Sequence, residues 1–251
     1  MPSSNDADLS VQLYTVRTAL ADDFVGTLGR LAEIGFTRVE PFAFVAFADQ
    51  LREGLAAHGL AAPTAHVGLL SGNQDEIFAL AKELGIETVI DPFVDPARWQ
   101  DAKEIASIAH QLNAAAEKAA ELGLRVGYHN HWFELESSFD GKHGLEVLAD
   151  NLAPEVVLEV DTYWAYVGGA DVPALLGRLG DRVVAVHVKD GDGTRNTKKQ
   201  VPAGSGVVPI WDILDATPAA ALRVIEFDDS EGDLVDGVAA SRAYLLAGKG
   251  A

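Results

Sequence analysis

The chain has 251 residues, of which 48% are hydrophobic and 23% are charged, a composition typical of globular proteins. This length suits one or two domains, and α/β barrels often reach it as a single domain. The chain contains no cysteine, which excludes disulfide bonds, thiolate zinc sites and cysteine nucleophiles. Nineteen basic residues against 38 acidic ones give a net charge of −19, which opposes binding to the phosphate backbone of a nucleic acid.

The sequence shows neither a membrane-spanning segment nor a secretory signal peptide. No apolar run approaches the roughly 18 residues that a membrane-spanning helix requires. Residues 1–8 have neither the basic segment nor the apolar segment of a secretory signal peptide. We therefore expect a cytoplasmic protein without a membrane partner, formed by one domain over residues 1–251 with a disordered N-terminus over residues 1–8.

Short β-rich runs alternate with longer amphipathic stretches along the whole chain. Several amphipathic stretches stop at a glycine, which is a frequent helix C-cap, as at Gly35, Gly59 and Gly85. The predicted order is strand 9–15, helix 24–34, strand 37–40, helix 45–58, strand 62–67, helix 74–84, strand 86–90, helix 102–122, strand 124–131, helix 144–151, strand 156–160, helix 172–179, strand 182–188, helix 210–216, strand 221–227 and helix 234–246.

Eight strand–helix units predict parallel strands joined by right-handed crossovers. Their number and the chain length match an α/β fold of one class, the (β/α)8 TIM barrel, which we predict as a single domain. A doubly wound sheet is the alternative, and its dinucleotide-binding form carries a glycine-rich turn after the first strand. The residues that follow the first predicted strand, Val16-Arg-Thr-Ala-Leu20, contain no such turn, so the barrel is preferred.

Polar side chains gather at the ends of the predicted strands, where barrels of this class carry their working residues. Asp161, His187 and Glu226 end three successive strands, and adjacent strands lie about 4.8 Å apart, so the three side chains can converge. A mixed set of carboxylates and imidazoles suits Mn²⁺, Co²⁺, Mg²⁺, Fe²⁺ or Zn²⁺. The alternative is a hydrogen-bonded polar plug at the barrel mouth that holds no ion.

A fourth metal ligand is expected around the end of the fifth predicted strand, which closes on His129-Asn-His131. Glu134 is the preferred ligand, because it follows in the loop, can fold back, and would add a second glutamate to the set. His129 is the alternative, and it points to the same strand face as His131 by period-two alternation. A third interpretation has the two histidines packing the barrel top through hydrogen bonds.

Other residues near strand ends are expected to contact a substrate. His66 could bind a substrate hydroxyl or cap the barrel core, and Glu40 could contact substrate or form a structural salt bridge. Tyr14 and Trp164 offer flat aromatic faces that suit the C–H surfaces of sugars, although core packing explains them almost as well. The expected substrate-binding set is Tyr14, Glu40, His66, His129, Trp164 and Lys189.

Five segments carry a family resemblance, namely Gly127-Tyr-His-Asn-His-Trp-Phe-Glu134, Leu158-Glu-Val-Asp-Thr-Tyr-Trp164, Val186-His-Val-Lys-Asp190, Gly204-Ser-Gly206 and Val224-Ile-Glu-Phe-Asp228. In order and strand position they resemble the sugar phosphate isomerase/epimerase-like family of the xylose isomerase-like TIM barrels, over nearly the whole chain. The resemblance implies one divalent metal held by a Glu, an Asp, a His and a second Glu, the last three corresponding to Asp161, His187 and Glu226. Many epimerases have a glutamate where this chain has Tyr-His-Asn-His. The Tyr-His-Asn-His sequence is more similar to that of inosose dehydratases and keto-glycoside lyases.

Together these features predict a divalent-metal-dependent isomerase or epimerase that acts on a small sugar or cyclitol. A base would remove the proton next to a carbonyl, and the metal would stabilise the enediolate. His131 is the first candidate for that base, followed by Glu226 and Glu134. Expulsion of a β-hydroxyl or β-alkoxide from the same intermediate gives the alternative, a dehydratase or lyase acting on a keto-sugar, keto-glycoside or inosose.

Two other classes of protein, a non-catalytic sugar-binding barrel and an apurinic endonuclease, are less compatible with the sequence. A non-catalytic sugar-binding barrel would not need the metal-ligand set Asp161, His187 and Glu226. An endonuclease of the apurinic type carries three zinc ions and needs more histidines than the seven in this chain, and the charge of −19 opposes DNA. We therefore expect a small carbohydrate as the partner and no nucleic acid, and the sequence is compatible with a homo-oligomer.

Overall fold

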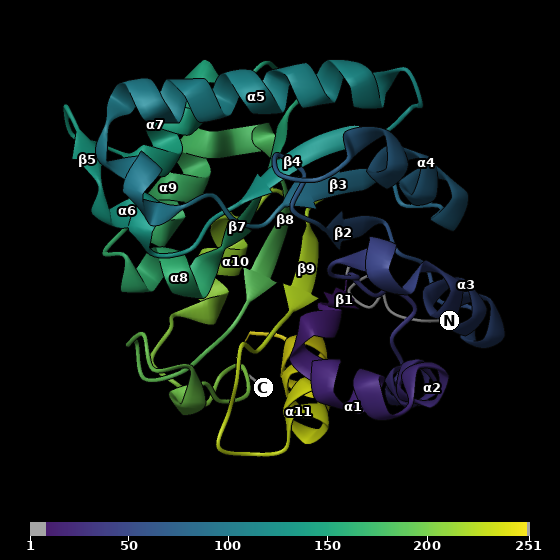
Figure 1. The fold of residues 1–251 in the computed structure, drawn as a ribbon. Helices are drawn as coiled ribbons and strands as arrows, with labels where there is room; N and C mark the ends of the chain where they lie inside the picture. Colours follow the sequence, from purple (N-terminus) through teal and green to yellow (C-terminus); the bar gives the residue numbers. More distant parts are fainter. Residues whose placement is uncertain (1–8, 250–251) are drawn as a thin grey trace.

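A curled parallel sheet lies at the centre of the computed structural model, which describes residues 9–249 (Figure 1). The predicted disorder of residues 1–8 lies outside this range. Seven strands pair in the order β1-β9-β8-β7-β4-β3-β2, and every pairing in this sheet is parallel. These strands are β1 (Leu9–Val11), β2 (Thr64–His66), β3 (Thr88–Asp91), β4 (Arg125–His129), β7 (Val157–Asp161), β8 (Val183–Val188) and β9 (Leu222–Ile225).

Residues 38–42 close the ring between β1 and β2. They pair with both neighbours in parallel through isolated bridges, rather than as the continuous strand that the sequence predicted. The backbone N–H of Glu40 donates to the carbonyl of Val11 at 2.8 Å, and that of His66 donates to the carbonyl of Pro41 at 2.7 Å. With this eighth segment the sheet becomes a closed barrel, so the predicted (β/α)8 fold is confirmed.

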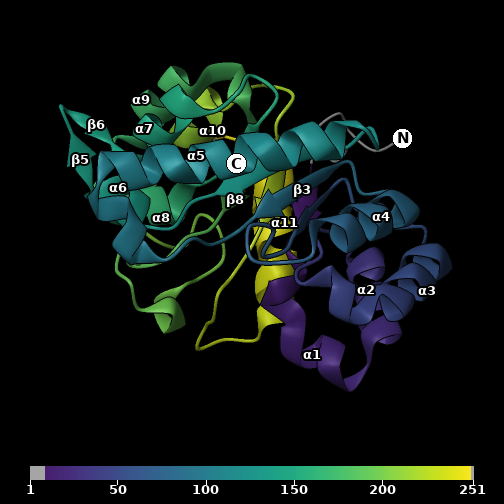
Figure 2. The same cartoon turned by 45° about the horizontal axis from the view of Figure 1, so that its top comes forward.

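Helices cover the outside of the barrel, and the C-terminal helix lies beside the N-terminal helical turn (Figures 1 and 2). Five of them match the predicted bounds residue for residue, because their ends are marked in the sequence. Asp23 accepts the N–H of Gly26 at the start of the first, and Gly35 and Gly85 end two of them with φ of 111° and 74°. The long helices are α2 (Phe24–Ile34), α3 (Ala48–His58), α4 (Gln74–Leu84), α5 (Ala102–Ala120), α7 (Gly144–Asn151), α9 (Val172–Leu179), α10 (Ile210–Ala216) and α11 (Leu234–Ala247).

Most of the short elements between the long ones were not predicted, whereas η3 (Phe44–Phe47) occupies the start of the predicted helix 45–58. The first predicted strand was wrong beyond Val11, because the Gln12 side chain accepts the N–H of Tyr14 at 3.1 Å and starts a helical turn. Asp161 ends β7 and also caps the helix that follows it, by accepting the N–H of Trp164 at 2.9 Å. These elements are η2 (Leu13–Val16), α1 (Arg17–Asp22), η3 (Phe44–Phe47), η4 (Pro96–Gln100), α6 (Phe133–Glu136), the hairpin β5 (Ser138–Phe139) and β6 (Lys142–His143), α8 (Thr162–Val167), η5 (Gly180–Arg182) and η6 (Thr197–Lys199).

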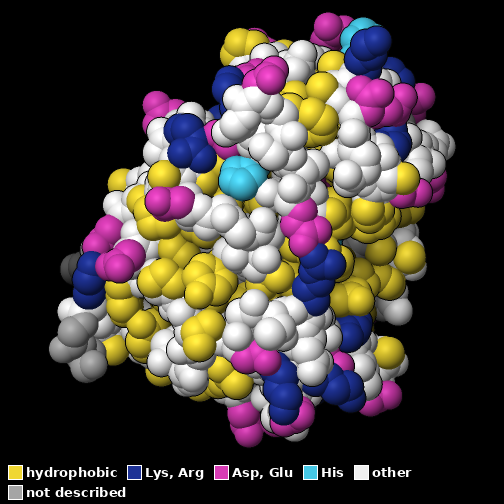
Figure 3. All heavy atoms as spheres, turned by 90° about the vertical axis from the view of Figure 1, so that its left-hand side faces the viewer, with side chains coloured by type: hydrophobic (Ala, Val, Ile, Leu, Met, Phe, Trp, Pro, Cys, Tyr) yellow, Lys and Arg dark blue, Asp and Glu magenta, His cyan; other side chains and the backbone are white. Residues whose placement is uncertain are grey.

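Apolar side chains fill the space between the barrel and its helices, whereas the barrel interior also holds buried polar groups, including Gln12, Glu40 and Glu159. On the face drawn in Figure 3, basic side chains lie scattered among acidic ones and do not form one basic patch. Within residues 9–249, no helix combines the length and the apolar composition needed to cross a membrane.

Candidate active site

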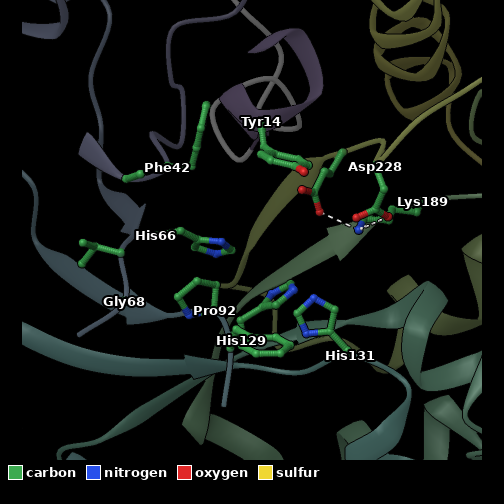
Figure 4. Close-up of a pocket in the computed structure, with 13 residues that line it drawn as sticks. Tyr14, Phe42, His66, Gly68, Pro92, His129, His131, Lys189 and Asp228 are labelled. Atoms are coloured by element: carbon green, nitrogen blue, oxygen red, sulfur yellow. Dashed lines mark hydrogen bonds and ion pairs between the residues drawn. The ribbon is translucent and has the colours of Figure 1, made fainter. Parts of the chain in front are cut away.

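A cavity of about 310 Å³ opens at the C-terminal mouth of the barrel (Figure 4). His66 and His129 point into it from β2 and β4, while Lys189 and Asp228 border it from the other side below Tyr14. The pocket therefore lies where the sequence placed the functional residues. Its remaining lining residues are Phe42, Ala43, Val67, Gly68, Pro92, Phe93, His131 and Glu226.

Asp161, His187 and Glu226 meet beside this cavity, and we call them the upper cluster. They are buried, and one ligand atom from each lies within 4.8 Å of the others. His187 Nδ1 is 2.6 Å from Glu226 Oε2 and 3.9 Å from Asp161 Oδ2. The ends of β7, β8 and β9 thus bring together the three residues that the sequence singled out.

A second group lies deeper in the barrel, and we call His66, His129, Glu159 and His187 the lower cluster. Glu159 Oε2 contacts His66 Nε2 and lies 3.1 Å from both His129 Nδ1 and His187 Nε2. Glu40 adds a second carboxylate, with its Oε1 2.8 Å from His187 Nε2. Glu159 was not predicted as a site residue, although it precedes Asp161 by two positions and must therefore share its strand face.

His187 belongs to both clusters, and His129 of the lower cluster has its second ring nitrogen toward Asp161 of the upper one. His129 Nδ1 and His187 Nε2 face Glu159, whereas His129 Nε2 lies 3.8 Å from Asp161 Oδ2 and His187 Nδ1 faces Glu226. A carboxylate that accepts one imidazole N–H fixes the tautomer and leaves the opposite nitrogen able to bind a metal. The buried histidine and carboxylate groups are therefore compatible with a divalent ion.

Lys189 places a positive charge among the carboxylates of the mouth. Its Nζ lies 2.6 Å from Glu226 Oε2, 2.8 Å from Asp161 Oδ2 and 2.9 Å from Asp228 Oδ2. Burial acts to lower the pKa of Lys189, but these carboxylates outweigh it and raise the pKa well above its usual value. Lys189 is thus a fixed cation in the pocket wall, two residues beyond His187 on the same strand face.

Burial and neighbouring charges set the ionisation of the carboxylates. Burial raises the pKa of Asp161 to about 6, although Lys189 opposes the shift. For Glu159 burial also acts upward, but His187 and then His66 outweigh it and hold the pKa well below its usual value. Glu226 behaves like Glu159, because Lys189 and His187 stabilise its ionised form. The centre of the site therefore keeps ionised carboxylates in contact with imidazoles.

Glu134 belongs to neither cluster in the described part of the chain. Its two oxygens accept the Tyr128 hydroxyl at 2.7 Å and the backbone N–H of His131 at 2.9 Å. Burial raises the pKa of Glu134 to about 8. The structure thus places Glu134 behind the turn that presents His131, and brings His129 to Asp161.

His131 lies in the pocket wall with its ring stacked on Phe133 at 5.5 Å. Burial, followed by the nearby Lys189 ammonium, lowers the pKa of His131 to about 4. Its Nδ1 is buried and has no hydrogen-bond partner among residues 9–249. The ring is therefore neutral at pH 7, with its Nδ1 unpaired among the described residues.

The other residues that were expected to contact a substrate lie at different distances from the pocket. Tyr14 lines the pocket and packs edge-on against Phe42 at 5.3 Å. Glu40 is fully buried beneath the pocket, where it accepts from Gln12 Nε2 at 2.8 Å and from the Thr64 hydroxyl. Trp164 lines a neighbouring cavity rather than the pocket itself.

The closed barrel of parallel strands defines a TIM-barrel protein. Such proteins carry their functional site at the C-terminal mouth, which is where this chain has its buried histidines and carboxylates. The family model for the xylose isomerase-like TIM barrel matches residues 28–244, and the chain belongs to this family.

Two inosose dehydratases resemble the chain in sequence. The protein from Lactiplantibacillus plantarum is 35% identical over 116 residues, which cover 46% of this chain and 36% of that protein. The protein from Geobacillus kaustophilus is 27% identical over 190 residues, which cover 65% of this chain and 60% of that protein. The matches thus span about a third and three fifths of these relatives.

Solved structures share the fold at lower identity. A sugar phosphate isomerase/epimerase from Parabacteroides distasonis has a TM-score of 0.79 at 21% identity, covering 96% of this chain and 94% of that one. D-psicose 3-epimerase has a TM-score of 0.68 at 15% identity, covering 96% and 100%. The IolI protein with a bound zinc atom has a TM-score of 0.68 at 12% identity, covering 96% and 98%.

Proposed function

We propose that the chain is a divalent-metal-dependent enzyme that removes the proton next to the carbonyl of a keto-sugar or inosose and then eliminates a β-oxygen. The observation that carries this proposal is the placement of His129 and His187, each with one nitrogen on Glu159 and the other toward the upper cluster. The two relatives named inosose dehydratases support elimination as the outcome. The same deprotonation serves a second candidate, isomerisation or epimerisation. His66 favours it, because His66 faces the pocket from β2 whereas His131 faces it from the turn after β4.

The metal would be held by His129 Nε2, Asp161, His187 Nδ1 and Glu226. Two nitrogens and two carboxylates suit Mn²⁺, Fe²⁺, Co²⁺ or Zn²⁺, and Mg²⁺ less well. When bound, the ion supplies Lewis acidity that polarises the substrate carbonyl. This set replaces Glu134, the ligand preferred from the sequence, by His129, because Glu134 is already engaged by Tyr128 and His131.

His131 is the proposed base. Its low pKa keeps the imidazole neutral at pH 7, and negative charge that develops on the substrate beside it favours its protonated form. The electron pair of the broken C–H bond forms a C=C bond as the β C–O bond breaks. The hydroxyl takes the proton from the His131 imidazolium and leaves as water, which returns the enzyme to its starting state.

Lys189 is the proposed electrostatic partner of the departing oxygen. Its ammonium contacts Asp228, which lies outside the proposed metal-ligand set, so the positive charge is in place before the substrate arrives. Glu134 holds the backbone of His131 and thereby acts as a positioning residue.

The test is proton exchange. The protein, loaded with Mn²⁺, is incubated with scyllo-inosose and with 3-keto-glucose in D2O, while NMR follows the α-proton and ultraviolet absorbance follows the enone product. We expect loss of the α-proton signal together with enone formation. His131→Gln should slow both by about 10²–10⁴-fold, the usual effect of removing a general base.

His110→Gln is the matched control, because His110 is exposed on α5. The proposal fails if His131→Gln turns over at the wild-type rate, or if the protein converts a substrate that has no carbonyl without an added redox cofactor. Exchange without enone formation would favour the isomerase or epimerase.

A further inference from the structure

The Lys189 ammonium lies against two of the four proposed metal ligands. Its Nζ is 2.6 Å from Glu226 Oε2 and 2.8 Å from Asp161 Oδ2. The other oxygen of Asp161 is already engaged, because Oδ1 accepts the backbone N–H of Trp164 at 2.9 Å. A divalent ion bound by Asp161 would therefore use the same oxygen that Lys189 contacts.

The contacts of Lys189 with Asp161 and with Asp228 differ in kind. Nζ donates a hydrogen bond to Asp228 Oδ2 at 2.9 Å. Asp161 Oδ2, in contrast, is buried and has no hydrogen-bond partner within residues 9–249, although the ammonium lies beside it. A buried acceptor without a hydrogen bond is unfavourable. The ion pair with Asp161 is thus the one that can more easily be exchanged for another cation.

Asp228 is a separate anchor for the ammonium, outside the proposed metal-ligand set. Gln200 Nε2 donates to Asp228 Oδ2 at 2.8 Å, and Gln200 Oε1 accepts the backbone N–H of Asp228 at 2.7 Å. Gln200 is itself buried. The Asp228 carboxylate is therefore held in place without the help of Asp161 or Glu226.

The active-site pocket gives the ammonium room to move. Lys189 and Asp228 both line the cavity of about 310 Å³, and Figure 4 shows them side by side at its border. Asp161 is not among the residues that line this cavity. A shift of Nζ away from Asp161 and toward Asp228 is therefore a shift toward open space, which requires no repacking of the core.

The charges favour such a shift when a metal binds. Two cations at the same buried carboxylate oxygen repel each other, because little solvent screens them. With the ammonium on Asp228 and the ion on Asp161 and Glu226, each cation has carboxylate partners of its own. Both positive charges can then remain in the site.

We propose that Lys189 and a divalent ion exclude each other at Asp161 and Glu226, so that the ammonium withdraws to Asp228 when an ion binds. This inference rests on the proposed metal-dependent function. An ammonium has three N–H donors, and withdrawal leaves those that faced Asp161 and Glu226 free for a substrate oxygen in the pocket. Metal binding thereby prepares Lys189 for its role beside the departing oxygen.

The first test is titration calorimetry with Mn²⁺. Lys189→Met should bind Mn²⁺ at least about tenfold more tightly than wild type, because a positive charge a few ångströms away opposes the ion. Lys142→Met is the matched control, since Lys142 is paired with Asp150 on the surface, and it should leave the affinity unchanged. Unchanged or weaker Mn²⁺ binding by Lys189→Met would contradict the proposal.

A double-mutant cycle separates withdrawal of the lysine from a direct effect of charge. Asp228→Asn should weaken Mn²⁺ binding about tenfold in the wild type, because the ammonium loses the charged partner to which it withdraws. In Lys189→Met the same substitution should have little effect, because the lysine is absent. An equal loss in both backgrounds would show that Asp228 acts on the ion directly, and would overturn the withdrawal.

Diffraction from wild-type crystals with and without Mn²⁺ tests the shift without any substitution. With Mn²⁺ bound, Nζ should lie beyond hydrogen-bond distance of Asp161 Oδ2 and Glu226 Oε2, at more than about 3.5 Å, and should keep its bond to Asp228. An ammonium that stays on Asp161 or Glu226 beside the bound ion contradicts the proposal alone. If neither the wild type nor any variant binds Mn²⁺, the metal-dependent function is contradicted and this inference with it.

Discussion

Glu159 lies beneath His129, with its Oε2 3.1 Å from the Nδ1 of the ring. Because this nitrogen faces a carboxylate, the tautomer with hydrogen on Nδ1 is stabilised, and Nε2 keeps its lone pair. Nε2 lies on the side of Asp161, 3.8 Å from its Oδ2. Glu159 is therefore a positioning residue whose effect is transmitted through the imidazole.

Glu159→Gln should lower the affinity for Mn²⁺ by about 10–100-fold, the usual consequence of removing a carboxylate behind a metal-binding histidine. Titration calorimetry of the metal measures the effect. Glu155→Gln is the control, because Glu155 is exposed just before β7. An unchanged Mn²⁺ affinity in Glu159→Gln, with a normal melting temperature, would show that Glu159 does not orient a ligand.

Two substitutions of Asp161 should separate its roles. Asp161→Asn keeps an oxygen that can accept the Trp164 N–H, whereas Asp161→Ala removes this helix cap. Both should abolish metal binding and turnover, and both lose the ion pair with Lys189, but the metal-free protein should be less stable with Asp161→Ala than with Asp161→Asn, by about 1 kcal/mol. That difference corresponds to about 2–4 °C in melting temperature, which calorimetry without metal can resolve. Activity in either variant at limiting metal would contradict the ligand assignment.

His129 and Glu134 should respond differently to substitution. We expect His129→Ala to weaken Mn²⁺ binding, and Glu134→Gln to slow turnover with little change in metal affinity, because Glu134 holds the His131 backbone. Diffraction at the metal absorption edge locates the ion directly. An ion within about 2.2 Å of a Glu134 oxygen would reject our assignment in favour of the ligand preferred from the sequence.

One ion pair away from the site should make stability depend on pH. Burial acts to raise the pKa of Glu146, but hydrogen bonds from Arg178 and from the His143 backbone N–H outweigh it, so the pKa is lowered. The resulting stability is present above the unfolded pKa of about 4.3 and is lost as the pH falls through the lower folded value. Its size should stay below about 1 kcal/mol, because Arg178 is half exposed.

Urea unfolding of wild type and Glu146→Gln measures this effect. The free-energy difference between them should shrink as the pH is lowered from about 7 to about 3, with most of the change below about 4.3. Glu117→Gln, an exposed position on α5, should show no such pH dependence. A constant difference across that range would contradict the role of the ionised carboxylate.

Asp190 organises the loop after β8 through four backbone hydrogen bonds. Its Oδ1 accepts from Gly191 at 2.9 Å and Val208 at 3.1 Å, and its Oδ2 accepts from Gly204 and Gly206 at 2.9 Å each. Asp190→Ala would leave these N–H groups unpaired, and should destabilise the protein by at least about 2 kcal/mol. Hydrogen exchange should accelerate at residues 204–208, whereas the exposed Asp192→Ala should leave their exchange unchanged.

The sequence predicted the outer helices best, because their limits depend on local chemistry. The caps at Asp23, Gly35 and Gly85 act within one turn of the backbone, so their effect can be recognised without knowing what the helix packs against. The turn at Gln12 is also local, but its side-chain cap competes with a β-rich pattern that favours a longer strand. Residues 38–42 show the opposite case, since their pairing depends on strands far away in the sequence.

Part of the candidate site was predictable, because the positions of some of its residues follow from the order of the strands. Asp161, His187 and Glu226 were found because each ends a strand, and parallel strands bring their ends to one edge. The engagement of Glu134 by Tyr128 was hidden, because it depends on how the turn after β4 folds back. The role of Glu159 required the positions of three histidines from three different strands.

Backbone pairing around the barrel is uneven, because residues 38–42 are joined to their neighbours only by isolated bridges. Continuous ladders join β4, β7, β8 and β9, which carry the proposed metal ligands, whereas isolated bridges hold the segment that bears Glu40 and Phe42. Local opening is easiest where backbone pairing is sparse. We therefore expect substitutions in the pocket wall around Phe42 and Tyr14 to change which ligands bind while leaving the strands that carry the proposed metal ligands intact.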